Sequence, residues 1–141
     1  MLNEWSTSQI DFVLAYPQAD IECDLYVRLP NGFEISSGNN KSHVLLLKRN
    51  LYGQRQGSKI WNDHLVLGLK KIGFEPSKID ESVFYKGKTM FFCYVDDGVF
   101  WGPDDDEIDK AINDLRKLKC DLEEIGDIED CVGVSFERKE D

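Results

Sequence analysis

Two adjacent carboxylates, Asp96 and Asp97, lie in a stretch whose flanking residues are almost wholly apolar. Residues 90–95 precede the pair, and residues 99–101 follow after one glycine. Neighbouring carboxylates in apolar surroundings repel each other and lose hydration, so they need a cation beside them. A divalent metal ion or a basic partner is the usual solution, which makes this pair the first candidate for chemistry.

The same residues also have a purely structural interpretation. Asp97-Gly98 is a common hairpin pair, so the stretch predicts a strand, a turn carrying Asp96 and Asp97, and a second strand. A third aspartate, Asp11, lies in a similar apolar run, where a simple strand-edge position is an equal alternative. Three such carboxylates together would suit two-metal phosphoryl transfer, in which two Mg²⁺ ions about 3.5–4 Å apart are held by oxygen ligands.

The expected elements bring these carboxylates together. Strands are predicted at 7–15, 25–29, 83–86, 89–95, 99–101 and 131–136, with a buried strand at 44–47. Helices are predicted from Ser58, as N-cap, to a stop at Gly73, and from the acidic cap at 104–106 to Leu118. This order predicts an α+β fold: a ferredoxin-like (split βαβ) antiparallel sheet with two main helices on one face. In such a sheet Asp11 and the turn of the central hairpin lie side by side.

Basic residues gather in one segment, with Lys48, Arg49, Arg55 and Lys59 close to Tyr52 in the sequence. Positive side chains with an aromatic residue and two glycines suit phosphate and base contacts. A solvated basic loop is the structural alternative.

Composition limits the remaining possibilities. The chain has 141 residues, 41% of them hydrophobic, which is enough for one domain with a core. Its four cysteines form no CxxC pair, so we expect reduced thiols rather than a zinc site. The net charge of −10 argues against a generic nucleic-acid binder. No signal sequence or membrane-spanning stretch is present, which predicts an intracellular, cytoplasmic protein.

Taken together, the motifs resemble the reverse transcriptase of copia-type long-terminal-repeat retrotransposons, within the pol polyprotein. The matching residues follow the family's order through nearly the whole chain: 9–11, 15–16, 24–33, 47–56 with Trp61, 80–84, 94–97 and 130–134. Tyr-Val-Asp-Asp at 94–97 alone is moderately specific, whereas the ordered set is strongly specific.

The resemblance implies an RNA-directed DNA polymerase palm domain over residues 1–141. Catalytic Asp11, Asp96 and Asp97 would hold two Mg²⁺ ions, with Mn²⁺ as a substitute. Tyr16 matches the position that excludes the ribose 2′-hydroxyl. Four residues match the stretch near the incoming nucleotide and template: Tyr52, Gly53, Gln54 and Arg55. Three fall where the family's primer-gripping strand lies: Val132, Gly133 and Val134. The implied partners are an RNA or DNA template with primer, deoxynucleoside triphosphates and the rest of a pol polyprotein, with no membrane.

The sequence also departs from the family pattern. Few residues precede Asp11 and few follow the last strand, so most of the fingers, the thumb and ribonuclease H are expected to be absent. Residues 56–59 replace a more usual Gln-Ala/Ser-x-Arg run, and Cys131 stands where Leu is commoner. One alternative is therefore a catalytically inactive remnant, acting as a binding module or without function. A metal-dependent nuclease or cyclase on the same fold is a third possibility. The residues at 51–56 favour a polymerase over both alternatives.

Overall fold

The structure is a computed structural model that describes residues 5–33 and 43–137. Its elements follow in this order: β1 (Ser6–Phe12), α1 (Ala15–Gln18), β2 (Tyr26–Arg28), β3 (Val44–Leu46), α2 (Gly57–Lys71), β4 (Glu75–Pro76), β5 (Val83–Lys86), β6 (Thr89–Tyr94), β7 (Asp97–Gly102), α3 (Asp105–Lys117), β8 (Leu122–Gly126), β9 (Asp130–Cys131) and β10 (Val134–Ser135).

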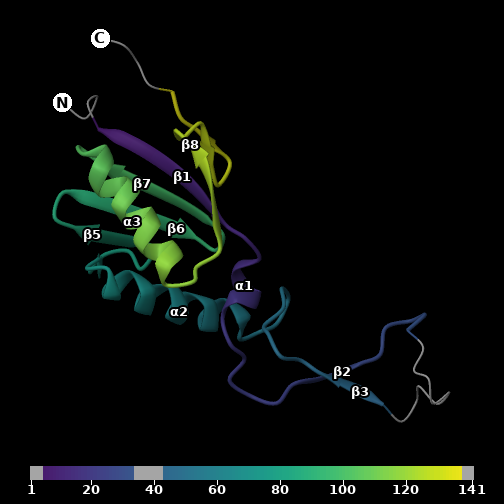
Figure 1. Cartoon of the computed structure of the whole chain (residues 1–141). Coiled ribbons are helices and arrows are strands. Elements are labelled where there is room, and N and C mark those ends of the chain that lie inside the picture. The colour runs from purple at the N-terminus through teal and green to yellow at the C-terminus, as the bar shows by residue number, and fades with distance from the viewer. Residues whose placement is uncertain (1–4, 34–42, 138–141) are drawn as a thin grey trace.

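Six strands form one sheet in the order β4-β5-β6-β7-β1-β8, and every neighbouring pair is antiparallel. The first strand, β1, lies second from the β8 edge, and the β5–β6–β7 meander crosses the sheet toward it, so that β7 pairs with β1. Figure 1 shows α3 lying across the sheet and α2 running below it. The expected α+β class, with an antiparallel sheet and two main helices, is confirmed.

Alternation along the strands explains where the core lies. Ile10, Phe91 and Phe100 are fully buried. They point to the same side of the sheet, since side chains two residues apart along a strand share a face. The helices supply the facing layer with residues at helical spacing, namely Trp61, Leu65 and Leu69 from α2 and Ile108, Ala111, Ile112 and Leu115 from α3. All of them belong to one hydrophobic cluster, so both helices are held by a single core.

The C-terminal segment covers part of the other sheet face. A single strand at 131–136 was predicted; this is wrong, because β9 and β10 form a small hairpin around Val132 and Gly133. Both turn residues have positive φ, 52° and 75°, as a two-residue hairpin loop of this twist requires. The aromatic ring of Phe136 then packs edge-on against Trp101, with 6.1 Å between centroids.

Strand β8 was not predicted from the sequence. It pairs with β1 at the sheet edge, but only Leu122 of its five residues is buried. An edge strand with one buried side chain has almost no hydrophobic alternation, which is why the sequence did not reveal it.

The starts of the elements also differ from expectation. Strand β1 ends at Phe12, and Ala15–Gln18 form the short helix α1, with Pro17 in the first turn, where an N–H would have no intrahelical partner. Helix α2 begins at Gly57 after Gln56, so Ser58 is not its N-cap. Two predictions are confirmed: Gly73 follows α2 with φ 92°, and Asp104 caps α3 by accepting a hydrogen bond from the Asp106 N–H.

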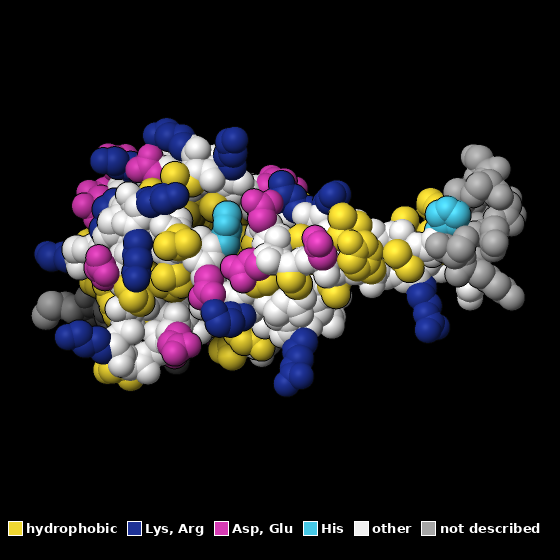
Figure 2. All heavy atoms as spheres, turned by 90° about the horizontal axis from the view of Figure 1, so that it is seen from below, with side chains coloured by type: hydrophobic (Ala, Val, Ile, Leu, Met, Phe, Trp, Pro, Cys, Tyr) yellow, Lys and Arg dark blue, Asp and Glu magenta, His cyan; other side chains and the backbone are white. Residues whose placement is uncertain are grey.

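Strands β2 and β3 pair with each other and project from the body as an arm (Figure 1). A strand forms at Val44–Leu46 as predicted, but its predicted burial is wrong, because Val44 and Leu46 are exposed. Figure 2 shows the arm in profile, with hydrophobic side chains on its surface. On the body in this view, basic and acidic side chains alternate and form no continuous basic surface. No helix in the described ranges 5–33 and 43–137 is long and apolar enough to cross a membrane.

Candidate active site

The structure places Asp11 beside Asp97, although 85 residues of chain separate them. These two residues are cross-strand partners in the β1–β7 pair. The Phe12 N–H donates to the Asp96 carbonyl oxygen at 2.8 Å, so the β6–β7 loop is tied directly to the end of β1. Because Ile10 and Phe12 point into the core, Asp11 faces the opposite side of the sheet. Cross-strand partners share a face, so the Asp97 side chain lies on that side too.

The turn differs from the predicted one by a residue. Tyr94 pairs with Asp97, so Val95 and Asp96 form the loop and Asp97 already belongs to β7. Gly98 is therefore a strand residue and not a turn residue. A Cβ at Gly98 would lie 2.9 Å from both Ile10 and Phe91 side-chain atoms, so packing explains this glycine.

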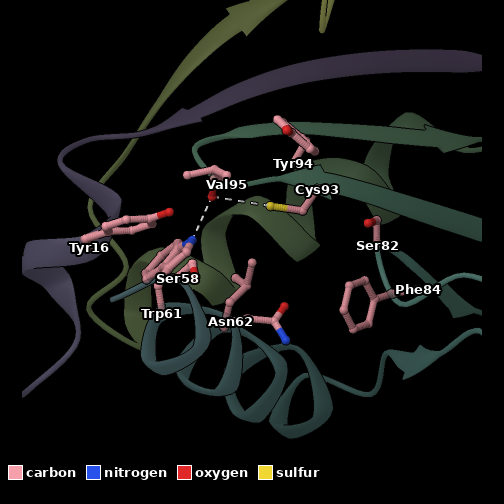
Figure 3. A pocket seen from close by; sticks show the side chains of 10 residues that line it. Tyr16, Ser58, Trp61, Asn62, Ser82, Phe84, Cys93, Tyr94 and Val95 are labelled. Carbon is pink, nitrogen blue, oxygen red and sulfur yellow. Dashed lines mark hydrogen bonds between the residues drawn. The ribbon is translucent and has the colours of Figure 1, made fainter. Parts of the chain in front are cut away.

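Val95 carries the unusual backbone of this loop. Its φ is 59°, a conformation that a β-branched residue rarely adopts. The Trp61 indole N–H donates to the Val95 carbonyl oxygen at 2.6 Å, and the Cys93 thiol lies 3.7 Å from the same oxygen (Figure 3). Trp61 itself is fixed in the core by an edge-on contact with Phe12 at 5.2 Å. A buried side chain of α2 therefore holds the loop that presents Asp96.

The carboxylates repel one another. Burial first, and then the charges of Asp96, Asp97 and Glu123, raise the pKa of Asp11. Burial, Asp96 and Asp130 likewise raise the pKa of Asp97. Glu123, the register partner of Asp11 on β8, and Asp130 on β9 are two acidic neighbours that the sequence did not reveal. Neither could be assigned to the site before β8 and the β9–β10 hairpin were known.

A cation fits this donor set chemically. Clustered carboxylates with raised pKa values are hard oxygen ligands that a divalent cation stabilises by removing their repulsion. Within the described residues, no three His, Cys, Asp or Glu side chains are close enough to hold a metal ion together.

Tyr16 lies beside this loop and is stacked on Tyr52. The two rings are 4.5 Å apart between centroids and inclined by 16°. Tyr16 also lines a cavity of about 190 Å³ between α2 and the end of β6, together with Trp61 and Val95 (Figure 3). Burial, followed by the charge of Asp96, raises the pKa of Tyr52, which shows that the stacked pair lies within electrostatic reach of the carboxylates.

The rest of the predicted nucleotide-binding stretch forms the loop before α2. Gly53 has φ 86° and Arg55 is exposed. The Gln54 amide is buried without a hydrogen-bond partner in the described part of the chain. Asn50, which the sequence did not single out, is fully buried and donates to the Ala19 carbonyl oxygen at 3.0 Å, so it ties this loop to the end of α1.

The expected basic cluster is partly neutralised. Arg49 is paired with Asp20, and Lys59 with Asp63 at 2.5 Å. Val132, Gly133 and Val134, the predicted primer-contacting residues, lie at the tip of the β9–β10 hairpin, where both valines are exposed. The cysteines Cys23, Cys93, Cys120 and Cys131 are all free thiols, as expected, and three of them are buried.

This chain belongs to the family of reverse transcriptases (RNA-dependent DNA polymerases), whose family model matches residues 1–141. Among similar proteins, a retrovirus-related Pol polyprotein from transposon TNT 1-94 of Nicotiana tabacum is 27% identical over 136 residues, covering 93% of this chain and 10% of the relative. The putative transposon Ty5-1 protein of Saccharomyces cerevisiae is 26% identical over 131 residues, covering 90% of this chain and 42% of the relative.

A third relative extends the same pattern. The retrovirus-related Pol polyprotein from transposon RE1 of Arabidopsis thaliana is 30% identical over 117 residues, which cover 80% of this chain and 8% of the relative. The chain thus spans less than half the length of each of these three relatives. Its homology is to retrotransposon polyproteins of the copia and Ty1 type. No solved structure gives a significant match.

Proposed function

We propose that residues 1–141 are the palm region of a retrotransposon reverse transcriptase and have a ferredoxin-like topology. Four strands, β6-β7-β1-β8, follow one another across the sheet, all antiparallel. Helix α2 lies between β1 and β6 in the sequence, and α3 lies between β7 and β8. This βαββαβ order, with one helix on each crossover, supports the split βαβ assignment.

The proposed reaction is template-directed transfer of a deoxynucleotide to a primer 3′-hydroxyl. The observation that carries this proposal is the pairing of Asp11 with Asp97, next to Asp96, on two adjacent strands. These three residues would hold two Mg²⁺ ions. Bound Mg²⁺ supplies activation of the attacking hydroxyl and stabilisation of the leaving oxygen. The protein's own part is to hold the three carboxylates in a fixed relation through the β1–β7 pairing.

Other residues have proposed binding roles around this centre. Tyr16 would face the sugar of the incoming deoxynucleoside triphosphate and exclude a 2′-hydroxyl. The loop with Tyr52, Gly53, Gln54 and Arg55 would lie near the nucleotide and template. The hairpin tip at 132–134 would contact the primer. In the cell this region would act with the rest of a pol polyprotein, because the relatives' names describe such proteins.

Primer extension by the purified chain tests the proposal. The substrates are a primed RNA template and the four deoxynucleoside triphosphates, with Mg²⁺ or Mn²⁺. We expect extension by the wild type and a loss of more than about 10²-fold in Asp96→Asn, because a charge-stabilising ligand is removed. Asp109→Asn on the exposed side of α3 is the matched control and should keep wild-type activity.

The outcome that contradicts the proposal is a well-folded wild type without extension, or an Asp96→Asn variant with undiminished extension. The first result would favour the catalytically inactive remnant. The second would assign any synthesis to a contaminant or to another site.

A further inference from the structure

Tyr16 is held by a neighbour that the loop before α2 provides. The Tyr52 ring is stacked on the Tyr16 ring at 4.5 Å between centroids, with an angle of only 16° between the planes. Two aromatic rings in this arrangement restrict each other's rotation, since either can turn only by giving up the shared contact. Tyr52 is still 48% exposed, so its burial does not by itself explain an aromatic residue here.

The Tyr52 hydroxyl lies near the start of helix α1. The backbone of Ala15 and of Tyr16 acts to lower the pKa of this hydroxyl, against the larger effect of burial, which raises it. Tyr52 therefore lies beside both the ring of Tyr16 and the backbone from which that ring extends.

Gly57 limits the ring from another direction. A Cβ at Gly57 would lie 3.2 Å from the Tyr16 Cδ2 atom and 3.4 Å from the Leu51 carbonyl oxygen. The first residue of α2 is thus in close contact with Tyr16 only because it has no side chain. A Cβ at this position would require the Tyr16 ring to move by a few tenths of an ångström, whereas the Leu51 carbonyl oxygen would stand at ordinary contact distance.

We propose that Tyr52 is a positioning residue that, together with Gly57, sets where the Tyr16 ring stands and so determines how strictly ribonucleoside triphosphates are excluded in favour of deoxyribonucleoside triphosphates. This inference rests on the proposed function and names two residues that act on its substrate selectivity through Tyr16. A Tyr16 ring held between the Tyr52 stack and Gly57 excludes one additional hydroxyl, whereas a ring free to rotate makes room for it.

Single-nucleotide extension with dATP or ATP, which differ only by the 2′-hydroxyl, tests this inference in the full chain. We expect Tyr52→Leu to lower the dATP-to-ATP selectivity by about tenfold or more, because small displacements at a reacting site have large effects. Tyr52→Phe keeps the ring and should recover most of the selectivity. Gly57→Ala should change the same ratio while leaving Tyr52 intact, and Tyr85→Leu, on β5, is the matched control.

Fluorine NMR of the chain labelled with 3-fluorotyrosine gives a readout that needs no activity. The chain has five tyrosines, and Tyr16→Phe identifies the Tyr16 signal by its loss. We expect Tyr52→Leu to shift that signal, Tyr52→Phe to restore it, and Tyr85→Leu to leave it unchanged.

The outcomes separate the two proposals. Selectivity and Tyr16 signal both unchanged in Tyr52→Leu and Gly57→Ala, with extension intact, would overturn this inference and leave the proposed function standing. A wild type that extends no primer would overturn the proposed function and the selectivity claim with it, while the NMR signal would still establish whether Tyr52 holds Tyr16.

Discussion

At the scale of single residues, the fold holds negatively charged carboxylates close together at the candidate site. Asp11 and Asp97 face each other across two strands, and both have raised pKa values. A folded-state pKa above the ordinary value of 3.8 means that ionisation of these groups opposes folding. The cost is present at neutral pH and shrinks as the pH falls through the raised pKa, because the folded state binds protons first.

Asp11→Asn should therefore stabilise the metal-free chain at pH 7, by on the order of 0.5–1 kcal/mol, or about 2–4 °C in Tm. This gain in stability over the wild type should diminish as the pH falls toward 3.8, the ordinary pKa of this carboxyl. Thermal unfolding followed by circular dichroism in EDTA measures both effects. An Asp11→Asn variant that melts below the wild type at pH 7 would rule out this electrostatic account, and Asp109→Asn serves as the neutral comparison.

At the scale of elements, the β6–β7 hairpin and α2 act together on the carboxylates. The loop residue Val95 holds a backbone conformation that costs of order 1–3 kcal/mol, and the surrounding structure must maintain it. The 2.6 Å hydrogen bond from Trp61 to the Val95 carbonyl oxygen is the contact best suited to do so. The packing of α2 against β1 thereby determines where Asp96 lies.

Trp61→Phe removes this hydrogen bond while keeping an aromatic ring in the core. We expect the extension rate to fall by about 10- to 100-fold with little change in the KM for nucleotide, because geometry rather than binding is lost. Val95→Asn, whose side chain tolerates positive φ, should restore part of the rate in the Trp61→Phe background. Trp101→Phe, on the other sheet face, is the control; an equal loss there would mean that Trp61 acts only through stability.

The close packing around Gly98 leads to a prediction about the stability of the fold. An alanine Cβ there would lie 2.9 Å from side-chain atoms of Ile10 and Phe91, so β7 must shift away from β1 or the core must rearrange. We expect Gly98→Ala to destabilise the fold by about 1–3 kcal/mol in urea unfolding. Gly68→Ala in α2, whose Cβ would meet nothing closer than 3.9 Å, should be neutral or stabilising. Equal stability of Gly98→Ala and wild type would show that the site tolerates a wider strand spacing.

The two main helices and the β5–β6–β7 meander could be predicted from the sequence, because their apolar residues recur at clear helical or alternating spacing. Strand β8 could not, since Leu122 is its only buried residue. The β9–β10 hairpin was also missed, because a valine, Val132, occupies a positive-φ turn position that usually signals glycine or asparagine. The apolar setting of Asp11, Asp96 and Asp97 marks them as candidate site residues in the sequence, whereas Glu123 joins the candidates only through the β1–β8 register.

At the scale of the whole molecule, the net negative charge opposes the binding of nucleic acid. The chain carries a net charge of −10, and Arg49 and Lys59 are already paired with aspartates. Binding of a polyanion depends on net neutralisation of its phosphate charge, so the chain by itself offers little positive charge to bind nucleic acid. Divalent cations at the carboxylates would remove part of the repulsion at the place where the proposed reaction requires the primer end.

Fluorescence anisotropy of a labelled primer–template duplex checks this point. We expect weak binding in EDTA and affinity about tenfold higher in millimolar Mn²⁺, with the gain lost in Asp97→Asn. Asp109→Asn should behave as the wild type. Tight binding in EDTA, insensitive to Asp97→Asn, would place the nucleic-acid contact elsewhere on the chain.

The most direct test of the central claim is Mn²⁺ binding, followed by electron paramagnetic resonance, to the wild type, Asp11→Asn and Asp97→Asn. If β1 and β7 build one metal site, either substitution alone should weaken binding by about tenfold or more, whereas Asp109→Asn should not. If Asp11→Asn binds Mn²⁺ as the wild type does, Asp11 and the β6–β7 hairpin do not share a metal site, and the proposed polymerase centre is wrong.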